Sequence, residues 1–263
     1  MVDGLRCMSR HLRTFYCFER AAVEKNAKEI KDHIEELYWV TSNNVVLLGH
    51  SKGGVDAACS MFWPELKDKV VGLVLVQSSY GGSPITSDIL HEGQIANVET
   101  RLILEVLICK IIKALEDLTN EKHREFLDMY SLPTDIPIIS FHTEASQTPR
   151  AISTMFHIAH AELPWLPGTT RGEDSSQGTP KLYVAIPSSA AMPICALHPK
   201  LRYGEMSDGL VTRKDAEVPG SIIVKPDRKL DHAWMVYSPS RKGPNALDAA
   251  QMCEALLTFA FEP

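Results

Sequence analysis

The order of apolar and polar positions separates helices from strands along this chain. Between residues 23 and 37 the apolar positions advance by three or four residues, with charged residues between them: Val23, Ala27, Ile30, Ile34 and Leu37. This spacing predicts one amphipathic helix. After a break at Asn43 and Asn44, residues 45–48 form a short apolar run that is typical of a strand buried on both faces.

The next segments predict a βαβ unit. Residues 49–54 are rich in glycine and favour a sharp turn. Residues 55–59 are mostly small and predict a helix that packs closely against a sheet and ends before Pro64. A second apolar run at 70–76 predicts another strand, and this order indicates a parallel sheet.

Later strands are predicted at 136–141, 182–186 and 221–224, and a closing helix at 246–261 with Asn245 as its N-cap. No repeat or linker divides the chain, so we expect a single domain of residues 1–263.

Two segments between these elements differ from the rest. Residues 88–130 lack strand signals, and their apolar helical stretch at 98–118 is either a cap over an active site or a packed helix of the outer layer. Residues 164–180 are rich in proline, glycine and serine, and we expect a mobile loop there.

Composition narrows the classes of function. The 263 residues are 44% hydrophobic and 23% charged, as in ordinary globular domains. A net charge of -6 gives no general attraction to nucleic acid or to an anionic membrane, so a small-molecule partner fits better. The six cysteines include no Cys-x-x-Cys pair, and we expect free thiols in a reducing compartment. The oligomeric state has no signal in the sequence.

The first twenty residues carry four arginines without a continuous apolar stretch, and no later run approaches the roughly 18 apolar residues of a membrane span. We therefore expect a soluble cytoplasmic protein. The alternative, a remnant of a signal for an organelle such as the chloroplast, stays open.

The segment Gly49-His50-Ser51-Lys52-Gly53 has the pattern of a nucleophile elbow between a strand and a helix. A serine hydroxyl is a weak nucleophile, so acyl transfer needs a base and donors for the developing oxyanion. We expect Ser51 to be the nucleophile and the backbone N–H of Lys52 to be one oxyanion donor. Gly49 and Gly53 are expected to be required because a side chain at either position would clash.

The acid and the histidine should follow the serine in that order, in loops after late strands. Asp208 lies in a turn-rich segment and is the expected acid, with Asp215 and Asp227 as rivals. His232 follows the last strand and is the expected base.

Other histidines are expected to have different roles. His50 is expected to be a structural or pocket-lining neighbour rather than the base, because adjacent side chains diverge on such a turn. His157 and His160 lie near Glu162, but no fourth ligand has a helpful spacing. We therefore expect no metal site.

Four segments together resemble a known family: Gly-His-Ser-Lys-Gly-Gly at 49–54, Tyr-Gly-Gly-Ser-Pro at 80–84, Ser-Asp-Gly-Leu-Val at 207–211 and Leu-Asp-His-Ala-Trp at 230–234. From about residue 22 onward the chain resembles the lipase-like α/β-hydrolases of plants. The resemblance implies an α/β-hydrolase fold, with a mostly parallel sheet flanked by helices and a helical cap insertion. It maps nucleophile, acid and base onto Ser51, Asp208 and His232.

The N-terminal part of the chain differs from this family. Such hydrolases place several strands and an oxyanion loop, often starting His-Gly, ahead of the helix that precedes the elbow. Residues 1–20 contain no strand followed by His-Gly. We therefore expect a truncated N-terminal part without the second oxyanion donor, a loss that lowers rates on the order of 100- to 1000-fold.

The sequence thus predicts a serine esterase or lipase-like hydrolase that cleaves an apolar or lipid-like carboxylic ester without a metal or organic cofactor. The alternative is a non-catalytic relative that binds a ligand or a partner, which the missing front favours. Acyl transfer to an acceptor other than water uses the same triad and stays open.

Overall fold

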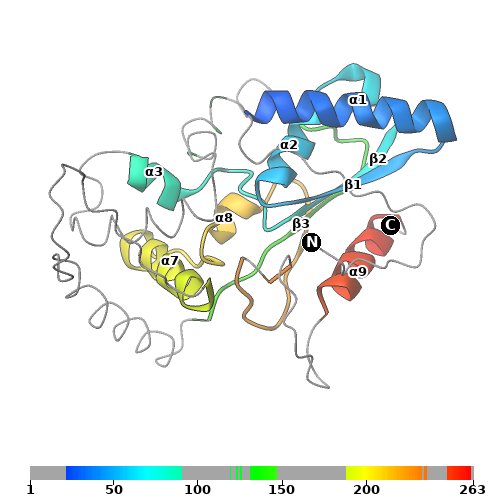
Figure 1. The fold of residues 1–263 in the computed structure, drawn as a ribbon. Coiled ribbons are helices and arrows are strands. Elements are labelled where there is room, and N and C mark those ends of the chain that lie inside the picture. Colours follow the sequence, from blue (N-terminus) through cyan, green and yellow to red (C-terminus); the bar gives the residue numbers. More distant parts are fainter. Residues whose placement is uncertain are drawn as a thin grey trace, which may run out of the picture.

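A parallel sheet in the order β1-β2-β3-β4 forms the centre of the computed structural model (Figure 1). The structure describes residues 22–90, 119, 123, 125, 131–146, 188–232, 234–235 and 248–261. Its strands are β1 (Val45–His50), β2 (Val70–Val76), β3 (Ile138–Phe141) and β4 (Ile222–Val224). Because all four strands run in the same direction, their carboxyl ends meet at one edge, where α/β proteins place their sites.

Helices cover both faces of this sheet. The described helices are α1 (Val23–Thr41), α2 (Lys52–Ser60), α3 (Pro84–Leu90), α7 (Ser188–Tyr203), α8 (Arg213–Ala216) and α9 (Ala249–Phe261), with a 3₁₀ turn η1 (Pro64–Leu66), and the faces are covered by α1, α2 and α9. Figure 1 shows α1 and α2 on one side of the sheet and α9 on the other. Helices α3 and α7 pack against each other.

The side chains of β2 alternate between two cores. Leu73 and Leu75 pack with residues of α1 and α2, whereas Val74 and Val76 pack with β3 and with α9. All four side chains are fully buried. Because helices cover both faces of the sheet, the side chains of β2 are buried on both sides, which explains why its sequence has no polar positions.

The apolar runs predicted most of these elements. β2 has the expected bounds, β1 continues to His50, and β3 and β4 begin one or two residues later than expected. Helix α1 continues past residue 37 to Thr41. Its C-cap residue, Ser42, adopts a left-handed conformation with φ 54°. Helix α2 begins at Lys52, earlier than the expected 55–59, because the turn after β1 is shorter than its glycine content indicated.

Several expectations concern residues that the structure does not describe. These are the strand at 182–186, the cap helix at 98–118, the loop at 164–180 and the N-cap Asn245. Helix α9 begins at Ala249, and the Asp248 carboxylate accepts a hydrogen bond from the N–H of Ala250 at 2.9 Å. The expected absence of early strands concerns residues 1–20, which also lie outside the described ranges.

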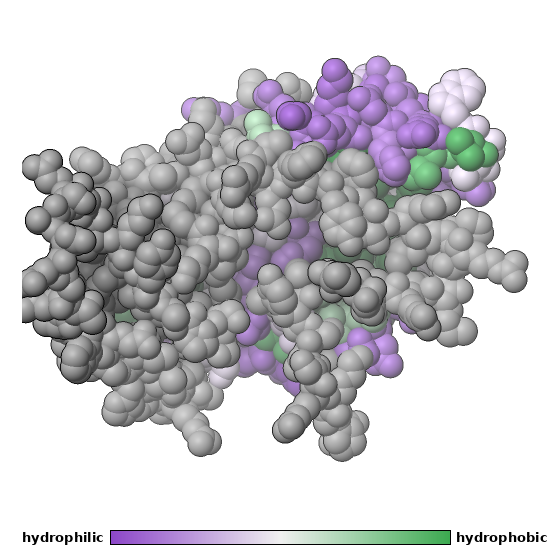
Figure 2. Space-filling model, viewed as in Figure 1, coloured by the Kyte–Doolittle hydropathy of each residue, from purple (hydrophilic) through white to green (hydrophobic). Residues whose placement is uncertain are grey.

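The outer surface of α1 is mostly hydrophilic, as Figure 2 shows, while Ala27 and Ile34 on its inner face are buried. Trp39 and Val40 near its C-terminal end are the exception and are largely exposed. Among the described residues, the helices are all too short or too polar to cross a membrane.

Candidate active site

Ser51 is the single residue of the turn between β1 and α2. Its φ of 54° and ψ of -128° are unusual for a residue with a side chain, and such conformations cost about 1–3 kcal/mol. The N–H of Ser51 donates to the carbonyl of Val76 at the end of β2, 3.0 Å away. This strained turn holds Ser51 at the carboxyl edge of the sheet.

On either side of this turn, the space around the backbone requires glycine at Gly49 of β1 and Gly54 of α2, and not at Gly53. A Cβ on Gly49 would lie 2.5 Å from both the Gly53 carbonyl oxygen and the Gly54 Cα, and a Cβ on Gly54 would lie 2.5 Å from the Ser78 Oγ. No described atom lies within 4 Å of a Cβ on Gly53. The expected clash at Gly53 is therefore wrong, because the first turn of α2 packs Gly54 against the strand instead.

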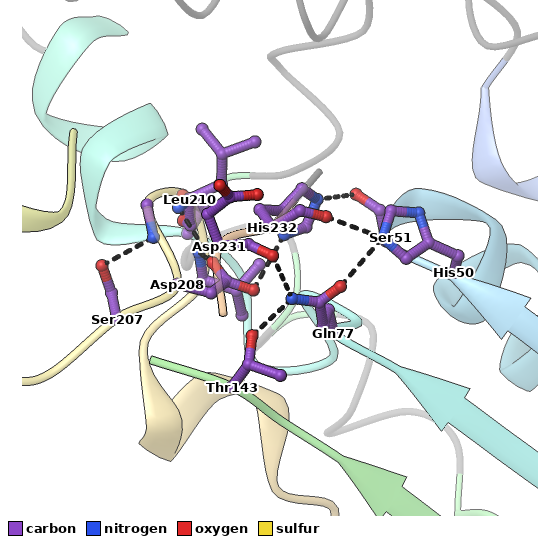
Figure 3. A network of polar contacts seen from close by, with 12 residues as sticks. His50, Ser51, Gln77, Thr143, Ser207, Asp208, Leu210, Asp231 and His232 are labelled. Atoms are coloured by element: carbon purple, nitrogen blue, oxygen red, sulfur yellow. Dashed lines mark hydrogen bonds and ion pairs between the residues drawn. The ribbon is translucent and has the colours of Figure 1, made fainter. Parts of the chain in front are cut away.

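Ser51, His232 and Asp208 lie in hydrogen-bonding contact (Figure 3). The Nε2 of His232 is 2.9 Å from the Oγ of Ser51, and the Nδ1 of His232 is 2.9 Å from the Oδ2 of Asp208. Asp208 and His232 are buried. Since an ionised carboxylate can only accept, Nδ1 carries the hydrogen when Asp208 is ionised, and Nε2 is then an acceptor that faces the Ser51 hydroxyl.

The Asp208 carboxylate is held by its own loop. Its Oδ1 accepts hydrogen bonds from the N–H groups of Leu210 at 3.0 Å and Val211 at 2.9 Å. The carbonyl oxygen of Asp208 also accepts the N–H of His232 at 2.9 Å. Both oxygens and the main chain of Asp208 are thus engaged, so its Oδ2 has a fixed direction toward the imidazole.

The two rival acids lie in other surroundings. Asp215 belongs to α8, where its N–H and its carboxylate are hydrogen-bonded to Thr212, the N-cap of that helix. Asp227 is exposed in the segment after β4. The structure therefore brings Asp208, and not these two residues, to His232.

The His50 side chain contacts the loop that carries His232 (Figure 3). Its Nε2 lies 3.1 Å from the carbonyl oxygen of His232, and the two rings are 5.0 Å apart. Desolvation by burial lowers the pKa of His50 to about 4, and nearby His232 adds to the shift. His50 is therefore neutral near pH 7.

Gln77 is a residue of this site that the sequence interpretation missed. It follows β2 directly, is fully buried and has a φ of 46°. Its side chain contacts Thr143, His50 and the carbonyl of Asp231. The signal available in the sequence was a polar residue at the carboxyl end of a buried strand, next to the strand that carries the nucleophile.

A buried ion pair lies in the first turns of α2. The Nζ of Lys52 is 2.8 Å from the Oδ1 of Asp56, and the Asp56 Oδ2 accepts a hydrogen bond from Asn26 of α1 at 2.9 Å. The Lys52 side chain therefore turns into the α1–α2 contact. The backbone N–H of Lys52 is in the first turn of α2, where helix geometry supplies no internal acceptor.

No cluster of three or more metal-ligating side chains occurs among the described residues. His157, His160 and Glu162, which we weighed as ligands, lie outside the described ranges.

Comparisons by sequence find no matching family model and no matching curated protein. Comparison by structure finds the Bacillus licheniformis lipase BlEst2 in its mature form, with a TM-score of 0.54 and 13% identity over 92% of this chain and 75% of that one. The metagenomic carboxyl esterase MGS0156 has a TM-score of 0.55 and 18% identity over 92% of this chain and 63% of its own. The propeptide form of BlEst2 has a TM-score of 0.53 and 14% identity over 87% of this chain, which spans 44% of that protein.

At these identities the likeness shows a common fold. The similar structures are bacterial and metagenomic proteins, and the resemblance to plant hydrolases stays a prediction. The parallel sheet flanked by helices agrees with the fold class expected from the sequence. This chain therefore has the α/β-hydrolase fold.

Proposed function

We propose that this protein is a serine hydrolase that cleaves a carboxylic ester, with Ser51 as nucleophile, His232 as general base and Asp208 as the residue that orients His232. The observation that carries the proposal is the pair of 2.9 Å contacts that link these three side chains, next to a serine in a strained turn. Perturbed backbone geometry at a reactive side chain is a known feature of functional sites.

The proposed reaction follows from the hydrogen positions. The Oγ of Ser51 attacks the ester carbonyl carbon as its proton passes to the Nε2 of His232. The C–O bond to the leaving alcohol then breaks, and His232 returns the proton to the departing oxygen. Water then attacks the acyl-serine while His232 takes one of its protons. The bond between the acyl carbon and Oγ breaks, the carboxylic acid leaves, and His232 gives its proton to Oγ, which restores the Ser51 hydroxyl.

Two groups of the chain stabilise charge during these steps. The Asp208 carboxylate offsets the positive imidazolium that forms on His232. The N–H of Lys52, in the first turn of α2, is the proposed donor to the negative charge that develops on the carbonyl oxygen, and the helix dipole favours that charge.

A carboxylic ester is the proposed substrate because the triad chemistry suits acyl transfer and because the similar structures include a lipase and a carboxyl esterase. An apolar acyl chain agrees with the resemblance to lipase-like hydrolases. The reaction as derived uses only groups of this chain and water.

The test is labelling of the purified full-length protein with a fluorophosphonate probe, followed by assays with short-, medium- and long-chain nitrophenyl esters. Ser51→Ala and His232→Ala should abolish labelling and lower hydrolysis by at least about 1000-fold. Ser60→Ala is a matched control, because Ser60 is a buried serine at the other end of α2 whose Oγ donates to the nearby Ala57 carbonyl.

Labelling that survives in Ser51→Ala would contradict the proposed nucleophile. A folded wild-type protein that is neither labelled nor active on any ester would instead support a non-catalytic, ligand-binding role. Ester formation with an added alcohol would distinguish acyl transfer from hydrolysis.

A further inference from the structure

Gln77 and His50 contact two successive carbonyl groups of the loop that carries His232 (Figure 3). The Nε2 of Gln77 donates to the Asp231 carbonyl at 2.9 Å and also to the Oγ1 of Thr143. The Nε2 of His50 lies 3.1 Å from the His232 carbonyl oxygen and 3.3 Å from the Oε1 of Gln77. The ends of β1 and β2 are thereby connected to a loop far away in sequence.

The chemistry of these partners fixes the hydrogen positions. A backbone carbonyl can only accept, so the amide nitrogen of Gln77 must face Asp231 and its Oε1 must face His50. The Nε2 of His50 then meets two acceptors, Gln77 Oε1 and the His232 carbonyl, and must carry the hydrogen. His50 can make both contacts as a neutral ring, which agrees with its lowered pKa of about 4.

The His232 backbone is held from a third direction as well. Its N–H donates to the carbonyl of Asp208 at 2.9 Å. Gln77, for its part, is fully buried and its N–H donates to the Phe141 carbonyl of β3 at 2.7 Å. The contacts from His50 and Gln77 therefore come from the ends of β1 and β2, whereas the contact from Asp208 comes from another loop.

We propose that Gln77 and His50 are positioning residues that set the distance between the imidazole of His232 and the Oγ of Ser51. This inference rests on the proposed function. Neither side chain contacts Ser51 Oγ in the described hydrogen bonds, so they act through the backbone of residues 231 and 232. Since displacement of a catalytic group by about 1 Å can lower a rate on the order of 100-fold, loss of these contacts should reduce kcat while leaving KM nearly unchanged.

The test compares variants that keep shape but change hydrogen bonding. Gln77→Met is unbranched and of similar length but cannot bond to the Asp231 carbonyl, and we expect its kcat to fall about 10- to 100-fold. His50→Phe keeps a ring but loses the donor, and we expect a similar fall. In His50→Gln the amide nitrogen is the same number of bonds from Cα as the histidine Nε2, so it should recover most of the wild-type kcat.

Ser140→Ala is the matched control for general destabilisation. Ser140 is fully buried on β3 and bonds to Ser221 and to the N–H of Val218, which places its hydrogen bonds away from the His232 loop. It should lower the melting temperature as Gln77→Met does, but keep the wild-type kcat. The rate of fluorophosphonate labelling should follow kcat in every variant.

The outcomes separate this inference from the proposed function. An inactive, unlabelled wild type would refute the function itself. An active wild type with unchanged kcat in His50→Phe would overturn the positioning role, as would equal losses of kcat in His50→Phe and His50→Gln. Because His50 is only partly buried, its variants keep the inference testable even if Gln77→Met does not fold.

Discussion

The Oδ2 of Asp208 lies 2.9 Å from the Nδ1 of His232, while its Oδ1 accepts two backbone N–H groups. This arrangement leaves the carboxylate no freedom to rotate away from the imidazole. The loop thus holds an acceptor that favours the His232 tautomer with the hydrogen on Nδ1, and Nε2 then faces the Ser51 hydroxyl.

The first prediction concerns the choice of acid. Asp208→Asn should lower kcat by about 1000- to 10,000-fold, because an amide can stabilise the wrong tautomer of His232. Asp227→Asn should leave kcat unchanged because Asp227 is exposed, and Asp215→Asn should affect stability through its contacts with Thr212. Steady-state kinetics and thermal melting of the three variants check this, and a large loss of kcat in Asp215→Asn with Asp208→Asn still active would contradict it.

The second prediction separates the glycines of the elbow. Gly49→Ala should destabilise the protein by about 3 kcal/mol or prevent folding, because its Cβ would lie 2.5 Å from the backbone of residues 53 and 54. Gly53→Ala should be neutral or stabilising by about 0.5–1 kcal/mol, since alanine favours the helix and no described atom is close. Urea denaturation of both variants is the measurement, and equal destabilisation would show that the close approach is not specific to Gly49.

The two glycines illustrate what the motif could predict. The pattern Gly-x-Ser-x-Gly located the turn and the serine that contacts His232, because the neighbouring apolar runs are buried strands of a parallel sheet. It did not tell which glycine packs against the strand, because that depends on the rotation of α2 as it leaves the turn. The motif specifies the spacing of residues along the chain, but not the direction in which each residue faces in the folded protein.

Gln77 shows a second limit. Ser51, Asp208 and His232 could be predicted because each belongs to a residue type with a defined chemical role and follows the chain order of this fold. Gln77 acts on a backbone carbonyl 154 residues away, and any residue type at Asp231 would supply the same carbonyl. Sequence spacing therefore contained no sign of the contact.

Helix α7 was not predicted for a different reason. Pro193 and Pro199 lie within its bounds, and proline in a helix interior usually indicates a helix end. Asp88 of α3 forms hydrogen bonds with His198 and Tyr203 of α7. These contacts are made by a helix whose local sequence disfavours helix formation. Tertiary packing here overrides propensity.

The third prediction tests the buried pair Lys52–Asp56. Lys52→Met and Asp56→Leu should each cost about 3–5 kcal/mol, because each leaves the other charge buried without its ionic partner. The double variant should cost less than the sum, since no unpaired charge remains. A double-mutant cycle by urea denaturation measures this coupling, and strictly additive losses would show that the two side chains are energetically independent.

The last prediction concerns stability against pH. The pKa of His50 is about 4 in the folded protein against an ordinary 6.5, mainly because burial disfavours the charged ring and because His232 is near, with Asp208 opposing the shift. Below about pH 6.5 the unfolded chain binds a proton that the folded chain does not, so stability should fall as pH decreases toward 4.

His50→Gln removes this titration and keeps the donor. The free energy of unfolding of the wild type should therefore decrease more steeply than that of His50→Gln between about pH 6.5 and pH 4, by at most about 1.4 kcal/mol per pH unit, the value for one proton. His142, whose pKa burial also lowers, contributes in the same direction in both proteins and cancels in the comparison. Urea denaturation across this range is the measurement, and parallel pH profiles for the two proteins would mean that His50 binds a proton equally well in the folded and unfolded chain.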